Sequence, residues 1–384
     1  MSAVSQRLER LSESATLAMA RKSRELRAQG LDIISLSIGE PDFNTPDFIK
    51  DAAKQAIDDN WTKYPPVPGI PSLREAIVRK LQRDNGLTYD SEQVVVSTGA
   101  KQAIMNVVLS MVNPGEEVLL PVPYWVSYRE MVRMADGIPV ELPTSVASDF
   151  KVTADQLDAA ITANTRLIIF STPCNPSGSA YTQAELEALA RVLEKHPQVY
   201  IICDEIYEHI LFADRHQSLA QFASIFDRVI TVNGVSKAFA MTGWRIGYIA
   251  AAPWIAKACI KIQGQFTSGA SAVSQKAAEA ALLADPAVTH AMCAQFQQRR
   301  DLVLNKLSEI PGVVCNVPQG AFYVFPDVSA YFGKSTGTTS IGNANDLCEY
   351  LLNEAHVALV PGEAFGAPNN LRISYAASEA QLTE

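Results

Sequence analysis

Short apolar runs alternate with helical patterns through the middle of the chain, from about residue 90 to residue 260. The apolar runs, which predict strands buried on both faces, occupy residues 94–96, 118–120, 167–170, 199–203, 229–232 and 246–250. Stretches with helical periodicity lie between several of them, at 100–112, 126–135 and 184–194. Buried strands separated by helices predict an α/β fold in which helices cover both faces of a mostly parallel sheet.

The order of predicted helices and strands changes towards the C-terminal end of the chain. Two long helical stretches, 271–283 and 287–308, precede short strand patterns at 321–325 and 371–375, with a helix near 345–354 between those strands. This change predicts a smaller α+β domain.

The N-terminal segment contains a helical pattern over 14–28 and a short strand at 33–36, and we expect it to pack against this smaller domain. The run 333–342, rich in Ser, Thr and Gly, predicts an exposed loop. A helical pattern at 378–384 stops with the printed sequence, which leaves the completeness of the C-terminus open.

Composition narrows the class of protein. A length of 384 residues predicts two or three domains, and 48% hydrophobic with 19% charged residues is typical of a globular chain. No apolar stretch is long enough to span a membrane, and the first residues lack the apolar core of a secretory signal. The net charge of −9 argues against general nucleic-acid binding. Six dispersed cysteines, with no CxxC pair, favour a reducing cytoplasm.

Several familiar motifs are absent. No GxGxxG is present, the P-loop and GxSxG patterns are incomplete, and the five histidines are scattered. Glu205 and His209 are spaced to share one face of a helix, but HExxH is missing, so we expect no metal site.

Polar residues that carry chemistry follow the predicted strands instead. Asp204 follows the strand 199–203, Lys237 follows 229–232, and Asn175 follows 167–170. Taken singly, Asp204 suits a turn or helix cap and Lys237 a solvated surface. Arg245, flanked by Trp244 and apolar strand residues, needs an anionic partner if it is buried. Together with Tyr207, these residues predict a pyridoxal phosphate pocket at the strand ends.

The chain resembles the class I pyridoxal-phosphate-dependent aminotransferases of fold type I, and is most similar to the gamma subgroup of bacterial aspartate aminotransferases. The matching blocks are Ser14-Ala15-Thr16, Gly39 to Phe43, Lys63-Tyr64, Thr98 to Ala103, Pro123 to Tyr128, Asn175 to Gly178, Asp204 to Glu208, Asn233 to Tyr248 and Leu371 to Tyr375. The resemblance implies a large cofactor-binding domain over residues 45–285. It also implies a smaller α+β domain formed by residues 1–44 and 286–384.

The resemblance assigns the catalytic roles to Lys237, Asp204 and Tyr207. Lys237 matches the lysine that binds the cofactor aldehyde and then moves the Cα proton. Asp204 would keep the pyridine nitrogen protonated. Tyr207 and Asn175 would donate to the phenolic oxygen of the ring, on which Trp125 would stack.

The phosphate of the cofactor is assigned to the turn that opens the helix at 100–112. Free backbone N–H groups at such a turn bind anions, and Arg245 would add a charged contact. Tyr64 matches a tyrosine that reaches the phosphate from a second subunit, which implies a homodimer with shared active sites. The remaining expected cofactor contacts are Gly99, Ala100, Lys101 and Ser236.

For the substrate, the resemblance assigns the α-carboxylate to Arg372, assisted by Gly39, Asn175 and Trp125. Strand alternation predicts that Arg372 points away from the apolar face of its strand. The distal carboxylate would be read by Lys101, Ser14 and Thr16. Members that use prephenate carry a lysine two residues before this serine, but Ser12 stands there, which argues against prephenate use.

The sequence therefore predicts a cytoplasmic aminotransferase that moves an amino group between L-aspartate and 2-oxoglutarate by a ping-pong route. The expected partners are amino-acid and 2-oxo-acid substrates and a second copy of the chain, with no nucleic acid and no membrane. The alternatives are a related enzyme acting on another donor (aromatic, alanine, prephenate or arogenate) and a C–S lyase. A non-catalytic regulator is the remotest alternative, because such regulators carry an N-terminal DNA-binding domain.

Overall fold

A seven-stranded sheet lies at the centre of the computed structural model, which describes residues 4–337 and 339–384. Its strand order is β2-β8-β7-β6-β5-β3-β4, and every neighbouring pair is parallel except those of β8, which runs antiparallel to both β2 and β7. The strands are β2 (Val94–Thr98), β3 (Glu117–Pro121), β4 (Ile138–Leu142), β5 (Thr165–Ser171), β6 (Tyr200–Asp204), β7 (Val229–Gly234) and β8 (Ile246–Ala250). The prediction of an α/β fold with a mostly parallel sheet is confirmed.

Strand β4 has no counterpart among the predicted strands. It forms one edge of the sheet and is mostly half-buried, so its sequence includes Pro139 and Glu141 rather than a continuous apolar run. Strand β2, at the other edge, was found because it is almost fully buried, so apolar continuity reports burial on both faces rather than a central position in the sheet.

Helices cover both faces of the sheet, because successive strand residues point to opposite sides. Val94 and Val96 of β2 belong to one buried cluster and Val95 to the other, and the same alternation separates Ile201 from Ile202 in β6. The first cluster takes in helices α3 (Asp47–Asp58), α4 (Pro71–Lys80), α7 (Ala154–Ala160), α8 (Gln183–Lys195) and α10 (Ala272–Leu283). The second takes in α5 (Gly99–Met111), α6 (Ser127–Met134) and α9 (Pro253–Phe266).

A third buried cluster joins the two ends of the chain. Met19 and Ile33 from the N-terminal segment pack with Phe296, Phe322 and Leu352 from the C-terminal segment. Its helices and strands are α2 (Ala15–Ala28), α11 (His290–Ser308), α12 (Ala344–Glu354), α13 (Glu379–Thr383), β1 (Ile34–Ser35), β9 (Tyr323–Val324), β12 (Val357–Ala358), β13 (Val360–Pro361) and β14 (Leu371–Ser374). This cluster supports the division into residues 45–285 and the two flanking segments, which stays a prediction. We call the part built around it the smaller lobe.

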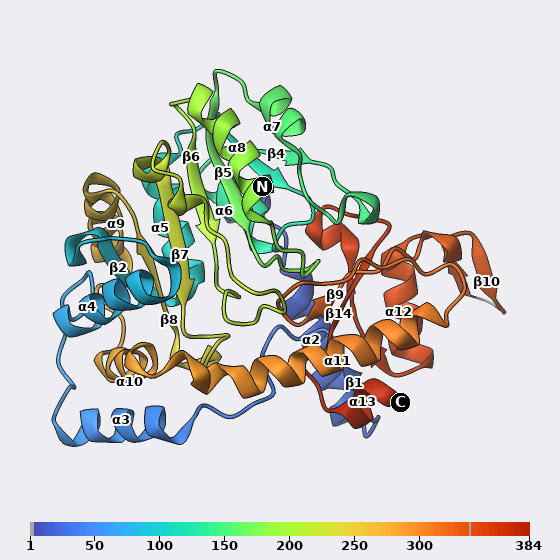
Figure 1. The fold of residues 1–384 in the computed structure, drawn as a ribbon. Helices are drawn as coiled ribbons and strands as arrows, with labels where there is room; N and C mark the ends of the chain where they lie inside the picture. The colour runs from blue at the N-terminus through green and yellow to red at the C-terminus, as the bar shows by residue number, and fades with distance from the viewer. Residues whose placement is uncertain (1–3, 338) are drawn as a thin grey trace.

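Helix α11 connects the two parts of the molecule. In Figure 1 it lies across the lower part of the view, from the helices beside the sheet to the lobe that carries β9 and β14. Within that lobe β14 pairs antiparallel with β9 and β13, while β1 pairs in parallel with β12. The N-terminal strand is thus held by the C-terminal segment.

One local prediction is wrong. The run 333–342 contains two antiparallel strands, β10 (Lys334–Thr336) and β11 (Thr339–Ile341), which form a ribbon rather than a loop. Figure 1 shows this ribbon at the outer end of the smaller lobe. The short strands have exposed polar side chains on β10, so no apolar alternation marks them.

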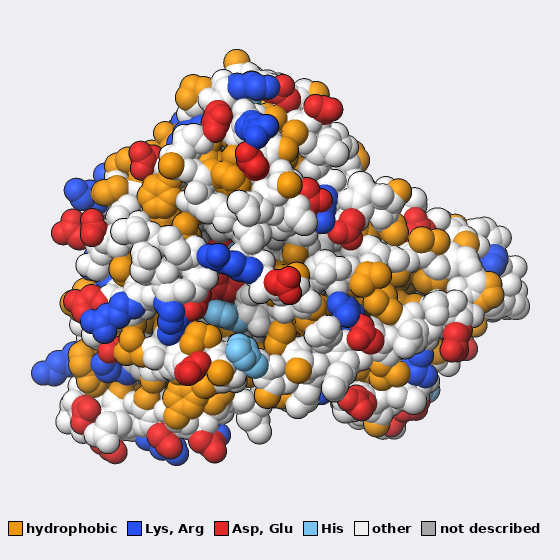
Figure 2. Space-filling view, in the orientation of Figure 1, with side chains coloured by type: hydrophobic (Ala, Val, Ile, Leu, Met, Phe, Trp, Pro, Cys, Tyr) orange, Lys and Arg blue, Asp and Glu red, His pale blue; other side chains and the backbone are white. Residues whose placement is uncertain are grey.

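The surface supports the charge argument on the face that Figure 2 shows. Acidic and basic side chains are interspersed there, with no broad area of one sign. Among the described residues, no helix combines the length and the apolar character that a bilayer span needs.

The direction of β8 brings its first residue to the functional edge of the sheet. Ile246 at the start of β8 pairs with Thr98 at the end of β2, and Gly247 pairs with Gly234 at the end of β7. Residues that precede β8 therefore lie beside the carboxyl ends of the parallel strands. Gly247 also permits close packing there, because a Cβ on it would lie 2.2 Å from the backbone nitrogen of Ala100.

Replacing Gly247 with alanine tests this contact. We expect Gly247→Ala to lower the free energy of unfolding by about 1–3 kcal/mol, since a backbone atom of α5 must move to admit the methyl group. Urea denaturation followed by circular dichroism measures the change. Gly264→Ala in α9 is the matched control, because only Val67 comes within 4.0 Å of the added carbon. Equal stability of the two variants would contradict the close approach.

Candidate active site

A cavity of about 470 Å³ lies where the carboxyl ends of the strands face the smaller lobe. All the predicted site residues line it except Gly99 and Tyr64. Those that do are Ser14, Thr16, Gly39, Ala100, Lys101, Trp125, Asn175, Asp204, Tyr207, Ser236, Lys237, Arg245 and Arg372. The fold thus gathers residues that lie more than 350 positions apart in the chain.

Lys237 follows β7 and points its amine towards the smaller lobe. The Nζ atom donates a hydrogen bond to the carbonyl oxygen of Gly39 at 2.5 Å. Burial lowers the pKa of the Lys237 amine to about 8, while the charge of Glu40 acts in the opposite direction. A substantial fraction of this amine is therefore neutral near pH 8, and only the neutral amine is a nucleophile or a base.

Asp204 ends β6 and is only 4% exposed. Its Oδ2 accepts a hydrogen bond from the Tyr128 hydroxyl at 2.6 Å, and its Oδ1 accepts one from the Ile206 N–H at 3.3 Å. Burial raises the pKa of the Asp204 carboxyl to about 6, although both hydrogen bonds favour the charged form. A cationic N–H group placed in the cavity would stabilise the ionised form of this carboxylate.

Tyr128 and Tyr323 also line the cavity, although no role was predicted for either of them. Tyr128 lies on α6 behind Asp204, and the Tyr323 hydroxyl lies 2.9 Å from that of Tyr207. A Cβ on Gly39 would lie 2.5 Å from the Tyr323 oxygen, so the position of this tyrosine leaves no room for a side chain at residue 39. Both tyrosines are buried and belong to apolar patterns, and nothing in those patterns distinguishes them from core residues.

Arg372 lies on β14, is 1% exposed and lines the cavity, whereas its neighbour Leu371 packs into the third buried cluster, so the predicted alternation is confirmed. Its Nη1 donates to Asn175 Oδ1 at 3.0 Å and its Nη2 to the Ser37 carbonyl at 2.7 Å. The guanidinium packs against the rings of Tyr323 and Phe365.

The Arg372 charge has no counter-ion within the protein. Its Nε has no hydrogen-bond partner, and in residues 4–337 and 339–384 no carboxylate forms an ion pair with it. A buried cation without a counter-ion is costly, so the site is built for an anion.

Two hydroxyl groups near the start of α2 are also without partners. Ser14 occupies the N-cap position, yet its side chain makes no capping hydrogen bond. The Thr16 Oγ1 is buried and unpaired. Near them the Lys101 ammonium lies 4.9 Å from the centre of the Trp125 ring, and partial burial lowers the pKa of Lys101. These groups can bind a second anionic group.

A further part of the cavity lies at the first turn of α5. Gly99 has a φ of +80°, and a Cβ there would lie 2.4 Å from the Arg245 guanidinium. Arg245 donates to the Thr242 carbonyl at 3.0 Å and is exposed, so the argument that a buried arginine needs an anionic partner does not apply to it. It lies in a left-handed turn with a φ of +57° just before β8, which directs it out over the helix N-terminus.

Tyr64 lies apart from this cavity. It does not line the pocket, and it is 97% exposed. A contribution from Tyr64 to the site of its own chain is therefore excluded.

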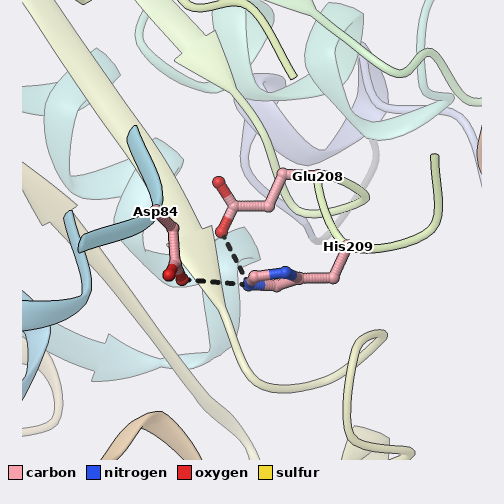
Figure 3. Close-up of side chains that lie close together, drawn as sticks. All are labelled: Asp84, Glu208 and His209. Atoms are coloured by element: carbon pink, nitrogen blue, oxygen red, sulfur yellow. Dashed lines mark ion pairs between the residues drawn. The ribbon is translucent and has the colours of Figure 1, made fainter. Parts of the chain in front are cut away.

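A buried ionic network lies beside β6, behind the cavity. Figure 3 shows His209 between Asp84 and Glu208, at 3.7 and 3.1 Å from their oxygen atoms. Burial lowers the pKa of His209 to about 3, so its imidazole is neutral at pH 7. The ammonium of Lys80, which is 1% exposed, contacts Glu208 directly, and the Arg83 guanidinium pairs with Asp84. These two cations offset the charges of the two carboxylates within the protein.

The network also corrects the expectation that Glu205 and His209 share a helical face. Residues 205–210 form turns, and Glu205 lies 3.3 Å from His216 instead.

The comparisons with known proteins agree with this geometry. Residues 31–384 match the family described as aminotransferase class I and II. The chain is 48% identical over 384 residues to a bifunctional aspartate aminotransferase and glutamate/aspartate-prephenate aminotransferase of Petunia hybrida, covering 99% of this chain and 80% of that protein. It is also 48% identical over 387 residues to an aspartate/prephenate aminotransferase of Cereibacter sphaeroides, covering 100% and 97%.

Solved structures give the same result. The crystal structure of the aspartate aminotransferase from Rhizobium meliloti superposes with a TM-score of 0.96 at 42% identity, covering 100% of this chain and 96% of that one. The aspartate aminotransferase from Thermus thermophilus with maleate gives 0.93 at 40% identity, covering 100% and 97%.

The titration of Lys237 is directly measurable. We expect reductive methylation of Lys237 in protein freed of small molecules to reach half its maximal rate near pH 8, because burial disfavours the ammonium form. Mass spectrometry of peptides follows each lysine separately. Lys54 is the control, since its hydrogen bond with Asp51 raises its pKa above the usual value of about 10.4. The same midpoint for both lysines would contradict the perturbed environment.

Proposed function

The chain belongs to the class I and II aminotransferase family, and from this membership we propose that it transfers an amino group between L-aspartate and 2-oxoglutarate. The observation that carries the proposal is Arg372, a buried guanidinium without a counter-ion that lines the same cavity as Lys237 and Asp204. An amino acid brings the carboxylate that this arginine lacks. The relatives named above, whose names include aspartate, support the choice of donor.

The proposed cofactor is pyridoxal 5′-phosphate, and the residues of the cavity fit it. The buried Asp204 carboxylate suits a protonated ring nitrogen, and the first turn of α5 with Arg245 suits the phosphate. Trp125 supplies an aromatic face, and Asn175 and Tyr207 supply polar groups at the ring edge. When bound, this cofactor supplies an aldehyde that takes up the amino group and a ring that accepts the electron pair from Cα.

The protein's own part in the reaction is to hold the substrate and move one proton. Arg372 binds the α-carboxylate and fixes the orientation of the Cα–H bond. The Lys237 amine, whose pKa is lowered to about 8, would take the proton from Cα, hold it on Nζ and give it back during the amino-group transfer. Tyr128 holds Asp204 through its 2.6 Å hydrogen bond, so the carboxylate stays aimed into the cavity.

Selection of a dicarboxylic substrate falls to the residues at the start of α2 and α5. The unpaired hydroxyls of Ser14 and Thr16 and the Lys101 ammonium are available for the distal carboxylate. Prephenate stays outside the proposal. Ser12 lines the neighbouring groove rather than this cavity, and its N–H donates to Glu130.

We also propose that the active enzyme is a homodimer in which Tyr64 completes the site of the other subunit. A groove of about 960 Å³ adjoins the cavity and shares Ser14, Lys101 and Arg245 with it. Tyr64 is exposed on its own chain, as are Trp61 and Phe266, of which Phe266 lines the groove. A tyrosine inserted by a second copy would meet Arg245 at the phosphate end. This exchange explains why a single chain leaves Tyr64 without contacts to its own cavity.

Hybrid dimers test the shared site. Lys237→Ala is expected to abolish transamination, and Tyr64→Ala to weaken it strongly by loosening the phosphate contacts. Co-expression of the two variants with different affinity tags, followed by purification on both tags, should restore roughly half of the wild-type activity per dimer, because each hybrid contains one intact site of two. Steady-state assays of doubly purified protein measure it. Hybrids no more active than the separate variants would contradict subunit sharing.

Reversing the charge of Lys101 tests the substrate assignment. We expect Lys101→Glu to lower kcat/KM for aspartate by about 100-fold or more, since the glutamate repels the distal carboxylate. Alanine has no distal carboxylate, so its kcat/KM should change by less than about threefold. A panel of amino-acid donors with 2-oxoglutarate provides the measurement. Equal losses for both donors would show that Lys101 does not read the distal carboxylate, and a wild-type enzyme inactive with every donor would overturn the function.

A further inference from the structure

One face of α2 contributes to the wall of the cavity. Leu17, Ala20 and Arg24 all line it, and their spacing of three and four residues places them on one side of the helix. Side chains on a helix lean towards its N-terminus. The Arg24 guanidinium is therefore directed back along α2, towards the end of the helix where Ser14 and Thr16 lie.

Arg24 is the basic residue of α2 that the protein leaves unpaired. Arg21 pairs with Glu13, Lys22 pairs with Glu349, and Arg27 donates to the Ile33 carbonyl. Within the described parts of the chain, Arg24 has no hydrogen bond, ion pair or ring contact. Helix α2 thus neutralises the charges on its outer faces and keeps one free cation at the cavity.

The cavity has more basic than acidic side chains, and the assignments made so far leave Arg24 without an anionic partner. Five basic residues and two acidic ones line the cavity, the acids being Glu40 and Asp204. The function proposed above occupies Lys237, Arg245 and Arg372 with the cofactor and the α-carboxylate. Glu40 is held by the Thr242 hydroxyl. The distal carboxylate of a dicarboxylic acid is then left with Lys101 and Arg24.

Lys101 is the other basic residue available to that carboxylate. Partial burial lowers its pKa, and the nearby charge of Arg245 lowers it further. An arginine stays charged at any physiological pH and offers several donors in one plane. Arg24 therefore adds a permanent charge at the side of the cavity formed by α2.

We propose that Arg24 is a specificity-determining residue that attracts the distal carboxylate of dicarboxylic substrates from α2, in addition to Lys101. This inference rests on the proposed function and deepens it. Arg24 acts as an exposed charge at the rim of the cavity, so its contribution is modest and sensitive to salt. Exposed charge pairs contribute up to about 1 kcal/mol, which corresponds to about a fivefold change in affinity.

Binding measurements test the proposal without turnover. The probes are succinate, a dicarboxylate that cannot react, and butyrate, its monocarboxylate analogue, both titrated into the cofactor-loaded protein by calorimetry. We expect Arg24→Gln to weaken succinate binding about fivefold at low salt, and Arg24→Glu by about 25-fold, with butyrate unchanged. The succinate effect should shrink as the salt concentration rises. Lys22→Gln is the matched control, because Lys22 lies on the same helix but pairs with Glu349.

The same variants are then compared as enzymes. Arg24→Glu should lower kcat/KM for aspartate and glutamate while leaving that for alanine within about twofold of wild type. Losses of equal size for butyrate and succinate, or for alanine and aspartate, would show a structural role and overturn the proposal. Unchanged succinate binding in both Arg24 variants would overturn it as well. If the wild-type protein binds succinate but transfers no amino group, the proposed function fails while the binding test of Arg24 still stands.

Discussion

Three charged groups share one cavity, and each of them is kept from water without a full complement of protein partners. Among the residues that the structure describes, Arg372 and Asp204 form no ion pair, and the one hydrogen bond of the Lys237 amine goes to a backbone carbonyl. Burial shifts the pKa of Asp204 upwards and that of Lys237 downwards, so each is displaced towards its neutral form. Isolated from ligand, this arrangement costs free energy. The surrounding fold has to be rigid enough to sustain that cost.

The sheet and the two lobes supply that rigidity in different ways. Asp204 and Lys237 follow neighbouring parallel strands, so their separation is set by the hydrogen-bond register of β6 and β7. Beside Asp204, the network around Glu205, Glu208 and Lys80 pairs buried charges among themselves and fixes the turn that carries Tyr207. Arg372 comes instead from β14 of the smaller lobe, where Asn175 and Ser37 hold its guanidinium.

The parts of the molecule that could be predicted from the sequence are those whose residues form an apolar run or a recognisable motif. Strands β2, β3, β5, β6, β7 and β8 were found because each contains a buried run made mostly of apolar residues. Residues such as Lys237 and Arg372 were predicted from motifs that occur in a fixed order along the chain, and both of them line the cavity. Tyr128 and Tyr323 were not assigned, because a buried tyrosine that supports a catalytic group has the same local pattern as one in the core. The exposure of Arg245 could not be foreseen either, since it depends on β8 running against its neighbours.

Helix α2 packs into the smaller lobe through Met19 and lines the cavity through Thr16 and Ala20. A ligand that fills the cavity therefore touches side chains anchored in both lobes at once. It acts as a removable cross-link, and its binding free energy adds to the cohesion of the molecule only while it is present. The free energy that keeps the two lobes associated therefore depends on the substrate concentration. Without a ligand, α11 and the third buried cluster connect the lobes.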